Sequence, residues 1–289
     1  MNLKKVVPVV VLSALLMAVF FGGTANAITG NYQSDSTHSC VGLVVFYGLD
    51  QSGNKVPVEV CSGVLISPTV MLTAAHACTT QTVQVCFDMG PITPTVTETG
   101  VIQLQGVTKL YEGVACPNPD FSFNLQNNNG SPNIMTHVVA VVILKEPVPT
   151  NVVSQYGQLP AEGLVDTLKS NTQVTLVGYG VQEHLSPRNT GLQQTWVGLL
   201  MRNSAQAKLV SGNFAWSDEF VRCSANPGQG RGGTAFGDSG GPVFIGGTNT
   251  VIALTSYVSN ANCVGGTYHC RIDNTDILNW INQEVEVHG

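Results

Sequence analysis

Two stretches that lie far apart in the sequence together offer a nucleophile and a base. Ser239 lies in the stretch Gly237-Asp238-Ser239-Gly240-Gly241-Pro242, where glycines let the backbone turn sharply and present a hydroxyl beside free N–H groups. His76 ends the small-residue stretch Leu72-Thr73-Ala74-Ala75-His76. A neutral serine hydroxyl is a poor nucleophile and must lose its proton to a nearby base as it attacks. The pair therefore predicts nucleophilic catalysis by Ser239 with His76 as its base.

Each stretch alone has a simpler interpretation. The serine stretch could be a tight turn, and His76 could be a core histidine whose hydrogen bonds are satisfied. The pattern Gly237-x-Ser239-x-Gly241 also fits the motif of α/β-hydrolase esterases, but that fold places its histidine after the serine and alternates strands with helices. Only His269 and His288 follow Ser239, and the helical periodicity is missing. An esterase of that fold is therefore the weaker alternative.

The first 27 residues have the pattern of a secretory signal peptide. Lys4 and Lys5 give a positive start, residues 6–21 form an apolar run, and Ala25-Asn26-Ala27 is a small-x-small cleavage site. The apolar run is short for a membrane anchor. We therefore expect residues 1–27 to be removed, the chain to be secreted, and the mature protein to have no membrane partner.

Composition narrows the possible partners of the mature chain. Removing the two N-terminal lysines leaves 10 basic and 18 acidic residues, a formal net charge of −8. This balance argues against nucleic acid, because phosphate binding needs clustered cations. The eight cysteines of an exported chain suggest disulfides. No Cys-x-x-Cys pair occurs, so we expect no zinc site. No residue pattern predicts a metal ligand set or a cofactor.

The elements that must position Ser239 and His76 are mostly short strands. Apolar and β-branched runs predict strands at 41–47, 59–66, 70–72, 82–87, 95–105, 107–114 and 138–144, then at 172–177, 192–201, 206–210, 220–223, 243–245, 251–258 and 268–272. Residues 125–133 read as an exposed loop, and 147–160 as the crossing between two halves. A final helix at about 276–285, capped by Asn274 or Thr275, buries one apolar face. This pattern predicts an all-β protein of two packed barrels, at about 28–148 and 161–275.

The two stretches also carry a family resemblance. Thr73-Ala74-Ala75-His76 and Gly237–Pro242, in that order, match the histidine and serine boxes of chymotrypsin-like (trypsin-like) serine proteases, and the sequence looks most like their secreted microbial branch. The resemblance covers essentially the whole mature chain, 28–289. It implies two six-stranded antiparallel β-barrels with a C-terminal helix. It also implies a monomeric serine endopeptidase that cleaves protein or peptide substrates through an acyl-enzyme.

The resemblance assigns roles to individual residues. Ser239 is the nucleophile, His76 is first general base and then general acid, and the N–H groups of Gly237 and Ser239 form the oxyanion hole. Cys61 and Cys78 flank the histidine box and are expected to form a disulfide; the pairing of the other six cysteines stays open. The specificity pocket is expected at Gly233, Ser256 and Val258. A floor without an acid disfavours Arg and Lys and favours small or medium apolar side chains.

The resemblance also predicts an ion pair at the N-terminus. Signal-peptide cleavage would create the new N-terminus Ile28-Thr29-Gly30, which looks like the mature start of the family. The α-amino group of Ile28 is then expected to pair with Asp238 and to order the oxyanion loop. If this cleavage itself exposes Ile28, no separate activating cut is needed.

One position departs from the family and affects the chemistry directly. Where the family has its third catalytic residue, an aspartate, this chain has Val138 in His137-Val138-Val139-Ala140. No shift of one or two residues supplies an acid, and neither Asp120 nor Glu146 matches the position. We therefore expect impaired activity. The alternative is a catalytically inactive homologue that acts as a binding protein.

Overall fold

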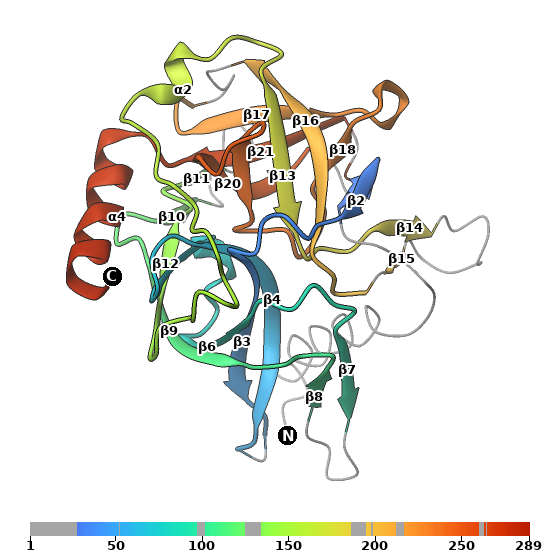
Figure 1. Ribbon diagram of the computed structural model, residues 1–289, viewed down its shortest axis with the longest axis vertical. Helices are drawn as coiled ribbons and strands as arrows, with labels where there is room; N and C mark the ends of the chain where they lie inside the picture. The colour runs from blue at the N-terminus through green and yellow to red at the C-terminus, as the bar shows by residue number, and fades with distance from the viewer. Residues whose placement is uncertain are drawn as a thin grey trace, which may run out of the picture.

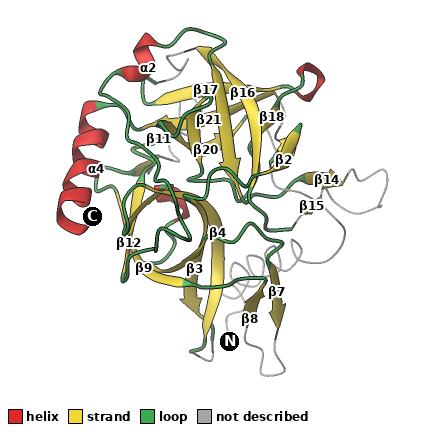
Figure 2. Ribbon diagram, viewed as in Figure 1, coloured by secondary structure: helices red, strands yellow, loops and turns green. Residues whose placement is uncertain are grey.

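The fold consists of two β-barrels stacked on each other, shown in a computed structural model (Figure 1). The structure describes residues 28–51, 53–96, 102–124, 134–185, 195–197, 199–211, 217–259, 263 and 265–289. Figure 2 shows that strands and loops account for most of these residues and that the C-terminal helix lies on the outside of the barrels. In the described part, no helix has the length and apolar character to cross a membrane, and no group of His, Cys, Asp and Glu could hold a metal ion.

The first barrel is closed and has six antiparallel strands in the order β12-β5-β4-β3-β6-β9. Most of its side chains that point inward are Val, Leu and Phe, which suit a pleated and buried surface. β12 is almost entirely buried because it lies between two neighbours in the barrel. The strands are β3 (Val41–Leu49), β4 (Lys55–Leu65), β5 (Val70–Thr73), β6 (Thr82–Cys86), β9 (Tyr111–Pro117) and β12 (Ala140–Leu144).

The second barrel is formed by six strands in the order β13-β19-β20-β21-β17-β16, and the pairing of β13 with β16 closes it. Together with the first barrel it confirms the predicted pair of six-stranded antiparallel barrels. Its strands are β13 (Gln173–Gly178), β16 (Asn203–Ser211), β17 (Phe220–Ala225), β19 (Pro242–Ile245), β20 (Val251–Val258) and β21 (Gly265–Arg271).

The N-terminal segment joins the second barrel, although it was predicted with the first. β1 (Thr29–Gly30) pairs with β18 (Gly232–Gly233), and β2 (Tyr32–Ser34) pairs with β16. The Asn31 side chain donates to the carbonyl of Pro227 at 2.8 Å. Such pairings join residues about 200 positions apart, which local hydrophobic patterns cannot reveal.

Short hairpins and one short helix decorate the barrels. The predicted strand at 95–105 corresponds to two paired strands, β7 (Thr93–Val96) and β8 (Ile102–Gln105), and among the described residues of 192–201 the strand is β15 (Thr195–Val197). The predicted loop at 125–133 lies outside the described residues. Elements without a sequence prediction are β10 (Ser122–Asn124), β11 (Ile134–Thr136), β14 (Glu183–Leu185) and α2 (Leu164–Thr167). These segments are too short for hydrophobic periodicity to develop.

The C-terminal helix α4 (Thr275–His288) ties the end of the chain to the first barrel. It packs on β5 and β12, as its position beside β12 in Figure 1 shows. Ile277 and Ile281 are fully buried on its inner face. Asn274 occupies the N-cap position but its side chain accepts no capping hydrogen bond.

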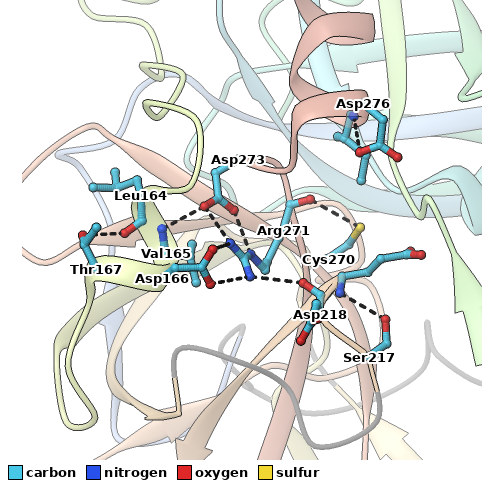
Figure 3. A network of polar contacts seen from close by, with 12 residues as sticks. Leu164, Val165, Asp166, Thr167, Ser217, Asp218, Cys270, Arg271, Asp273 and Asp276 are labelled. Carbon is cyan, nitrogen blue, oxygen red and sulfur yellow. Dashed lines mark hydrogen bonds and ion pairs between the residues drawn. The ribbon is translucent and has the colours of Figure 1, made fainter.

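A buried arginine connects α2 to the end of β21 (Figure 3). The Arg271 guanidinium donates to Asp273 and, through two nitrogens, to Asp166 at 2.9 and 3.0 Å. Asp273 is completely buried and also accepts the backbone N–H of Val165. The hydrogen bond from Arg271 holds the pKa of Asp166 below its ordinary value. A buried cation thus has both its carboxylate partners in hydrogen-bonding geometry.

We expect Asp273→Asn to lower the free energy of unfolding by about 3 kcal/mol, because it removes a buried charge that compensates Arg271. Asp166→Asn should cost under about 1 kcal/mol, because that carboxylate is half-exposed. Urea unfolding of both variants measures the difference. Equal losses would show that burial does not set the strength of these two contacts.

Candidate active site

His76 and Ser239 come together from different barrels. His76 lies in the 3₁₀ turn η2 (Ala75–Ala77), directly after β5 of the first barrel. Ser239 lies in the loop between β18 and β19 of the second. The imidazole Nε2 of His76 is 3.0 Å from Ser239 Oγ, which is within reach of proton transfer. The two residues predicted from the sequence therefore do form a pair.

Ser62 of β4 fixes the serine loop against the first barrel. Its backbone N–H donates to the carbonyl of Ser239 at 2.9 Å, and its hydroxyl donates to the carbonyl of Gly237 at 2.9 Å. The same hydroxyl accepts the N–H of Tyr179. A Cβ at Gly240 would lie 2.3 Å from the Thr73 hydroxyl, so only glycine allows this approach. Sequence reasoning missed Ser62, because nothing in a buried strand marks one serine as a contact between barrels.

The backbone at Gly237 and Ser239, where the oxyanion hole is predicted, has two N–H groups without described acceptors. Gly237 has φ +94°, a conformation that favours glycine. The N–H groups of Gly237 and Ser239 donate to no residue in the described part of the chain. Two N–H groups without protein acceptors beside a nucleophile can stabilise the negative oxygen of a tetrahedral intermediate.

The far side of the His76 ring has no partner. Its Nδ1 is buried and makes no hydrogen bond to any described residue. Burial lowers the pKa of His76 from 6.5 to about 4. The ring is therefore neutral above about pH 4, with no acid to stabilise the imidazolium that forms when it takes a proton.

Val138, which the resemblance aligns with an aspartate, lies just before β12. In the pairing of β12 with β5, Ala140 lies opposite Thr73. The pairing ends there, because the N–H of Val139 turns to donate to the carbonyl of His137. Val138 is completely buried. The backbone N–H groups of Ala75 and His76 donate to no described residue, so these two groups and Nδ1 of His76 are three polar atoms without described partners.

The other acids considered in the sequence lie elsewhere. Glu146 pairs with Lys109 at 3.0 Å. The N–H of Asp120 donates to the side chain of Asn118, and no contact of Asp120 with His76 occurs. Ser256, which was predicted for the specificity pocket, donates its hydroxyl to the carbonyl of Leu254.

Comparisons with known proteins agree with the fold of two barrels. A model of the trypsin family, described as "Trypsin", matches residues 45–281. The chain belongs to the trypsin family. Among solved structures, HL collagenase is similar with a TM-score of 0.60 and 17% identity over 89% of this chain and 97% of that one. A protein described as GrC has a TM-score of 0.59 and 15% identity over 90% of this chain and 100% of that one. No curated protein matches the chain.

Asp238, the acid before the nucleophile, is completely buried, as the trypsin-family resemblance requires. Its two carboxylate oxygens accept the N–H groups of Gly180 and Ala235, each at 2.8 Å. Burial nevertheless raises the pKa of Asp238 to about 7. A Cβ at Gly180 would lie 2.5 Å from the carboxyl carbon, so this glycine makes room for Asp238. A carboxyl group in this state would be stabilised by a cation.

Ile28 lies in the same barrel as Asp238 and is strained. Its side chain is completely buried in the core of the second barrel, beside Val174 and Leu176. Its φ is +61°, which a β-branched residue adopts only at a cost. That cost would vanish on cleavage of the Ala27–Ile28 bond, because an N-terminal residue has no φ.

The surroundings of Gly233 and Val258, two of the predicted pocket residues, are closely packed. Gly233 pairs with Thr29, and a Cβ at Gly233 would lie 2.3 Å from the methyl of Ala225. Val258 packs against a small apolar cluster of Val181, Ala235 and Cys263. The walls around Gly233 are thus narrow and uncharged.

All eight cysteines are free thiols in the structure. Cys61 Sγ lies 3.3 Å from the Thr73 hydroxyl, and Cys78 Sγ lies 3.6 Å from the Ala74 carbonyl. The disulfide between Cys61 and Cys78 therefore stays a prediction.

Proposed function

We propose that the mature chain, residues 28–289, is a secreted and monomeric serine endopeptidase whose activity is impaired by Val138. The supporting observation is the 3.0 Å contact between His76 Nε2 and Ser239 Oγ, combined with a buried His76 Nδ1 that has no partner. Membership of the trypsin family supports protease chemistry in general. The signal-peptide pattern of residues 1–27 supports secretion.

The steps follow from the positions of these atoms. Ser239 Oγ attacks the carbonyl carbon of the scissile peptide while its proton moves to His76 Nε2. The carbonyl oxygen becomes negative and receives the N–H groups of Gly237 and Ser239. His76 then gives the proton to the leaving amine, and the acyl group stays on Ser239. Water, deprotonated by His76, releases the acid and restores the hydroxyl.

The missing acid weakens the first step through the tautomer of His76. Nε2 can accept the serine proton only if the hydrogen of the neutral ring is on Nδ1. In that tautomer Nδ1–H is a buried donor without an acceptor, which costs about 1–3 kcal/mol. The other tautomer avoids this cost but cannot act as the base. The residual oxyanion hole and substrate binding still supply roughly 10³–10⁴-fold catalysis over water.

The proposed substrates are proteins or peptides with a small or medium apolar side chain before the cleaved bond. This follows from the uncharged surroundings of Gly233 and from Val258 on the pocket wall. The alternative is a binding protein that uses the same cleft without cleaving, and the observation that favours it is Val138 in the place of an acid.

An active-site phosphonate distinguishes the two functions. We expect a peptidyl phosphonate with an apolar first residue to label the mature protein slowly and with one-to-one stoichiometry. Ser239→Ala should abolish labelling and His76→Ala should slow it further, as intact-mass spectrometry would measure. A wild-type protein that stays unlabelled, while still binding the corresponding peptide, would establish the binding function instead.

The pH dependence of labelling reports the protonation of His76. Because the base must be neutral and burial lowers the pKa of His76 to about 4, we expect the labelling rate to be half-maximal near pH 4. An unperturbed histidine would give a midpoint near pH 6.5. A midpoint at or above pH 6 would contradict a buried His76 without a partner at Nδ1.

A further inference from the structure

A polar cavity lies between the N-terminal segment and the outside of the second barrel. Its volume is about 270 Å³. None of the residues assigned to catalysis lines it. The lining consists of Gln33, Asp35, Thr37, His38, Thr175, Ser204, Gln206, Gly247, Thr248 and Asn249.

Strand alternation explains why this face is polar. Val174 and Leu176 of β13 and Ala205 of β16 belong to the barrel core. Side chains alternate along a strand, so their neighbours Thr175 and Ser204 point outward. β2 continues the sheet beside β16, and the three strands lie next to one another in Figure 1. The segment after β2 then passes over this outer face, and its residues Asp35, Thr37 and His38 form one wall of the cavity.

A buried carboxylate fixes one wall of the cavity. Asp35 accepts the N–H groups of Thr37 and His38, at 3.0 and 2.7 Å, and lies 2.7 Å from His38 Nδ1. Burial raises the pKa of Asp35, but hydrogen bonds from the side chain and backbone of His38 outweigh it and leave this pKa below its ordinary value. The carboxylate is therefore ionised and its oxygens are occupied.

The orientation of His38 is set from two sides. Its ring stacks on Phe244 with centroids 4.8 Å apart and an angle of 15°. Because Nδ1 is engaged with Asp35, Nε2 is the ring nitrogen left to hydrogen-bond to a ligand. No described residue makes a hydrogen bond to Nε2 of His38. The lining of the cavity thus includes a hydrogen-bonding ring that is held in place from two sides.

The lining selects the chemical class of a ligand. It contains no Lys or Arg, and its single carboxylate has its oxygens occupied, so neither anions nor cations are favoured. The remaining groups are hydroxyls and carboxamides, which both donate and accept hydrogen bonds. The volume equals roughly nine water molecules at about 30 Å³ each, enough for a sugar ring.

We propose that this cavity binds a neutral polyhydroxylated molecule of monosaccharide size, one hydroxyl of which hydrogen-bonds to His38 Nε2. The ligand contacts the N-terminal segment and the second barrel at once. Its binding therefore stabilises the attachment of β2 to β16.

Saccharide titrations test the site in the mature chain carrying Ser239→Ala, which prevents self-digestion. D-glucose, D-galactose, D-mannose and N-acetyl-D-glucosamine are titrated to 50 mM and followed by backbone amide NMR. We expect at least one sugar to shift the amides of residues 33–38 and 247–249 with a dissociation constant in the millimolar range. The absence of a saturable shift with all four sugars overturns the proposal.

Two variants locate the binding. His38→Phe keeps the stack on Phe244 but cannot accept a hydrogen bond, and it should weaken binding at least tenfold. Thr37→Val removes one exposed hydroxyl without touching Asp35, and it should weaken binding two- to fivefold even if His38→Phe fails to fold. His288→Phe, on the far end of α4, is the matched control and should not change affinity. Unchanged affinity in both cavity variants, or saturable binding of acetate or ammonium instead of sugars, would contradict the assignment.

Discussion

Val138→Asp should raise kcat/KM for an apolar peptide substrate by at least about tenfold, and by at most about 10⁴-fold. The upper bound is the factor lost when the triad aspartate of a serine protease is neutralised, which corresponds to about 5.5 kcal/mol of transition-state stabilisation. The variant is assayed by steady-state kinetics at pH 7.5. The lower bound allows for imperfect placement of the new carboxylate.

The surroundings of Val138 explain why this one substitution can suffice. We expect a carboxylate there to accept hydrogen bonds from three donors that have no partner among the described residues: His76 Nδ1 and the backbone N–H groups of Ala75 and His76. A buried carboxylate is tolerated when hydrogen bonds satisfy it. The new charge would hold the Nδ1–H tautomer and raise the pKa of His76, because a nearby negative charge favours the imidazolium. The midpoint of the pH–rate profile should therefore move upward from about 4.

Controls separate this mechanism from a general change in packing. Val138→Asn has nearly the same shape without the charge, and we expect no comparable gain. Val138→Asp combined with Ser239→Ala should be inactive, which excludes a contaminating protease. If Val138→Asp folds, as circular dichroism would show, but gains no activity and keeps its acid midpoint, then the missing acid is not what limits the enzyme.

The sequence was informative wherever a signal is local. The β-branched run at 138–144 predicted β12, the apolar run at 251–258 predicted β20, and the two boxes identified His76 and Ser239. Their spatial contact followed from a family resemblance, because spacing along the chain does not determine distance in space.

Features that depend on distant pairings escaped prediction. Ser62, the contact of β2 with β16, and the Arg271 network each join residues about 100 or more positions apart. Such contacts depend on how the two barrels stack and close, and a single strand carries no mark of its partner. The cavity beside His38 is of the same kind, since four separate segments build it.

The second large effect concerns the amino group of Ile28. We expect a protein that begins at Ile28 to have at least tenfold higher kcat/KM than one that retains Ala27 at its N-terminus. In the retained form the ammonium group is on Ala27, one residue before Ile28, and we expect it not to pair with Asp238. The oxyanion loop then depends on a buried carboxyl group whose partners among the described residues are two backbone N–H groups. A free α-amino group has a pKa near 8 and is cationic at neutral pH, so it can pair with that carboxylate.

The stability of the two forms should also respond differently to pH. In the retained form the pKa of Asp238 rises from 3.8 in the unfolded chain to about 7 in the folded chain, so the native state binds the extra proton between these values. The contribution of Asp238 to the free energy of unfolding is then greatest below pH 3.8. It falls by on the order of 4 kcal/mol as the pH rises to 7. Pairing with the Ile28 ammonium lowers the pKa of Asp238 and removes most of this fall.

Urea unfolding between pH 4 and 8 measures how the free energy of unfolding of each form changes with pH. Asp238→Asn in the retained form is the control, and it should flatten the slope of that form. Identical slopes in the Ile28 and Ala27 forms would show that the amino group does not reach Asp238.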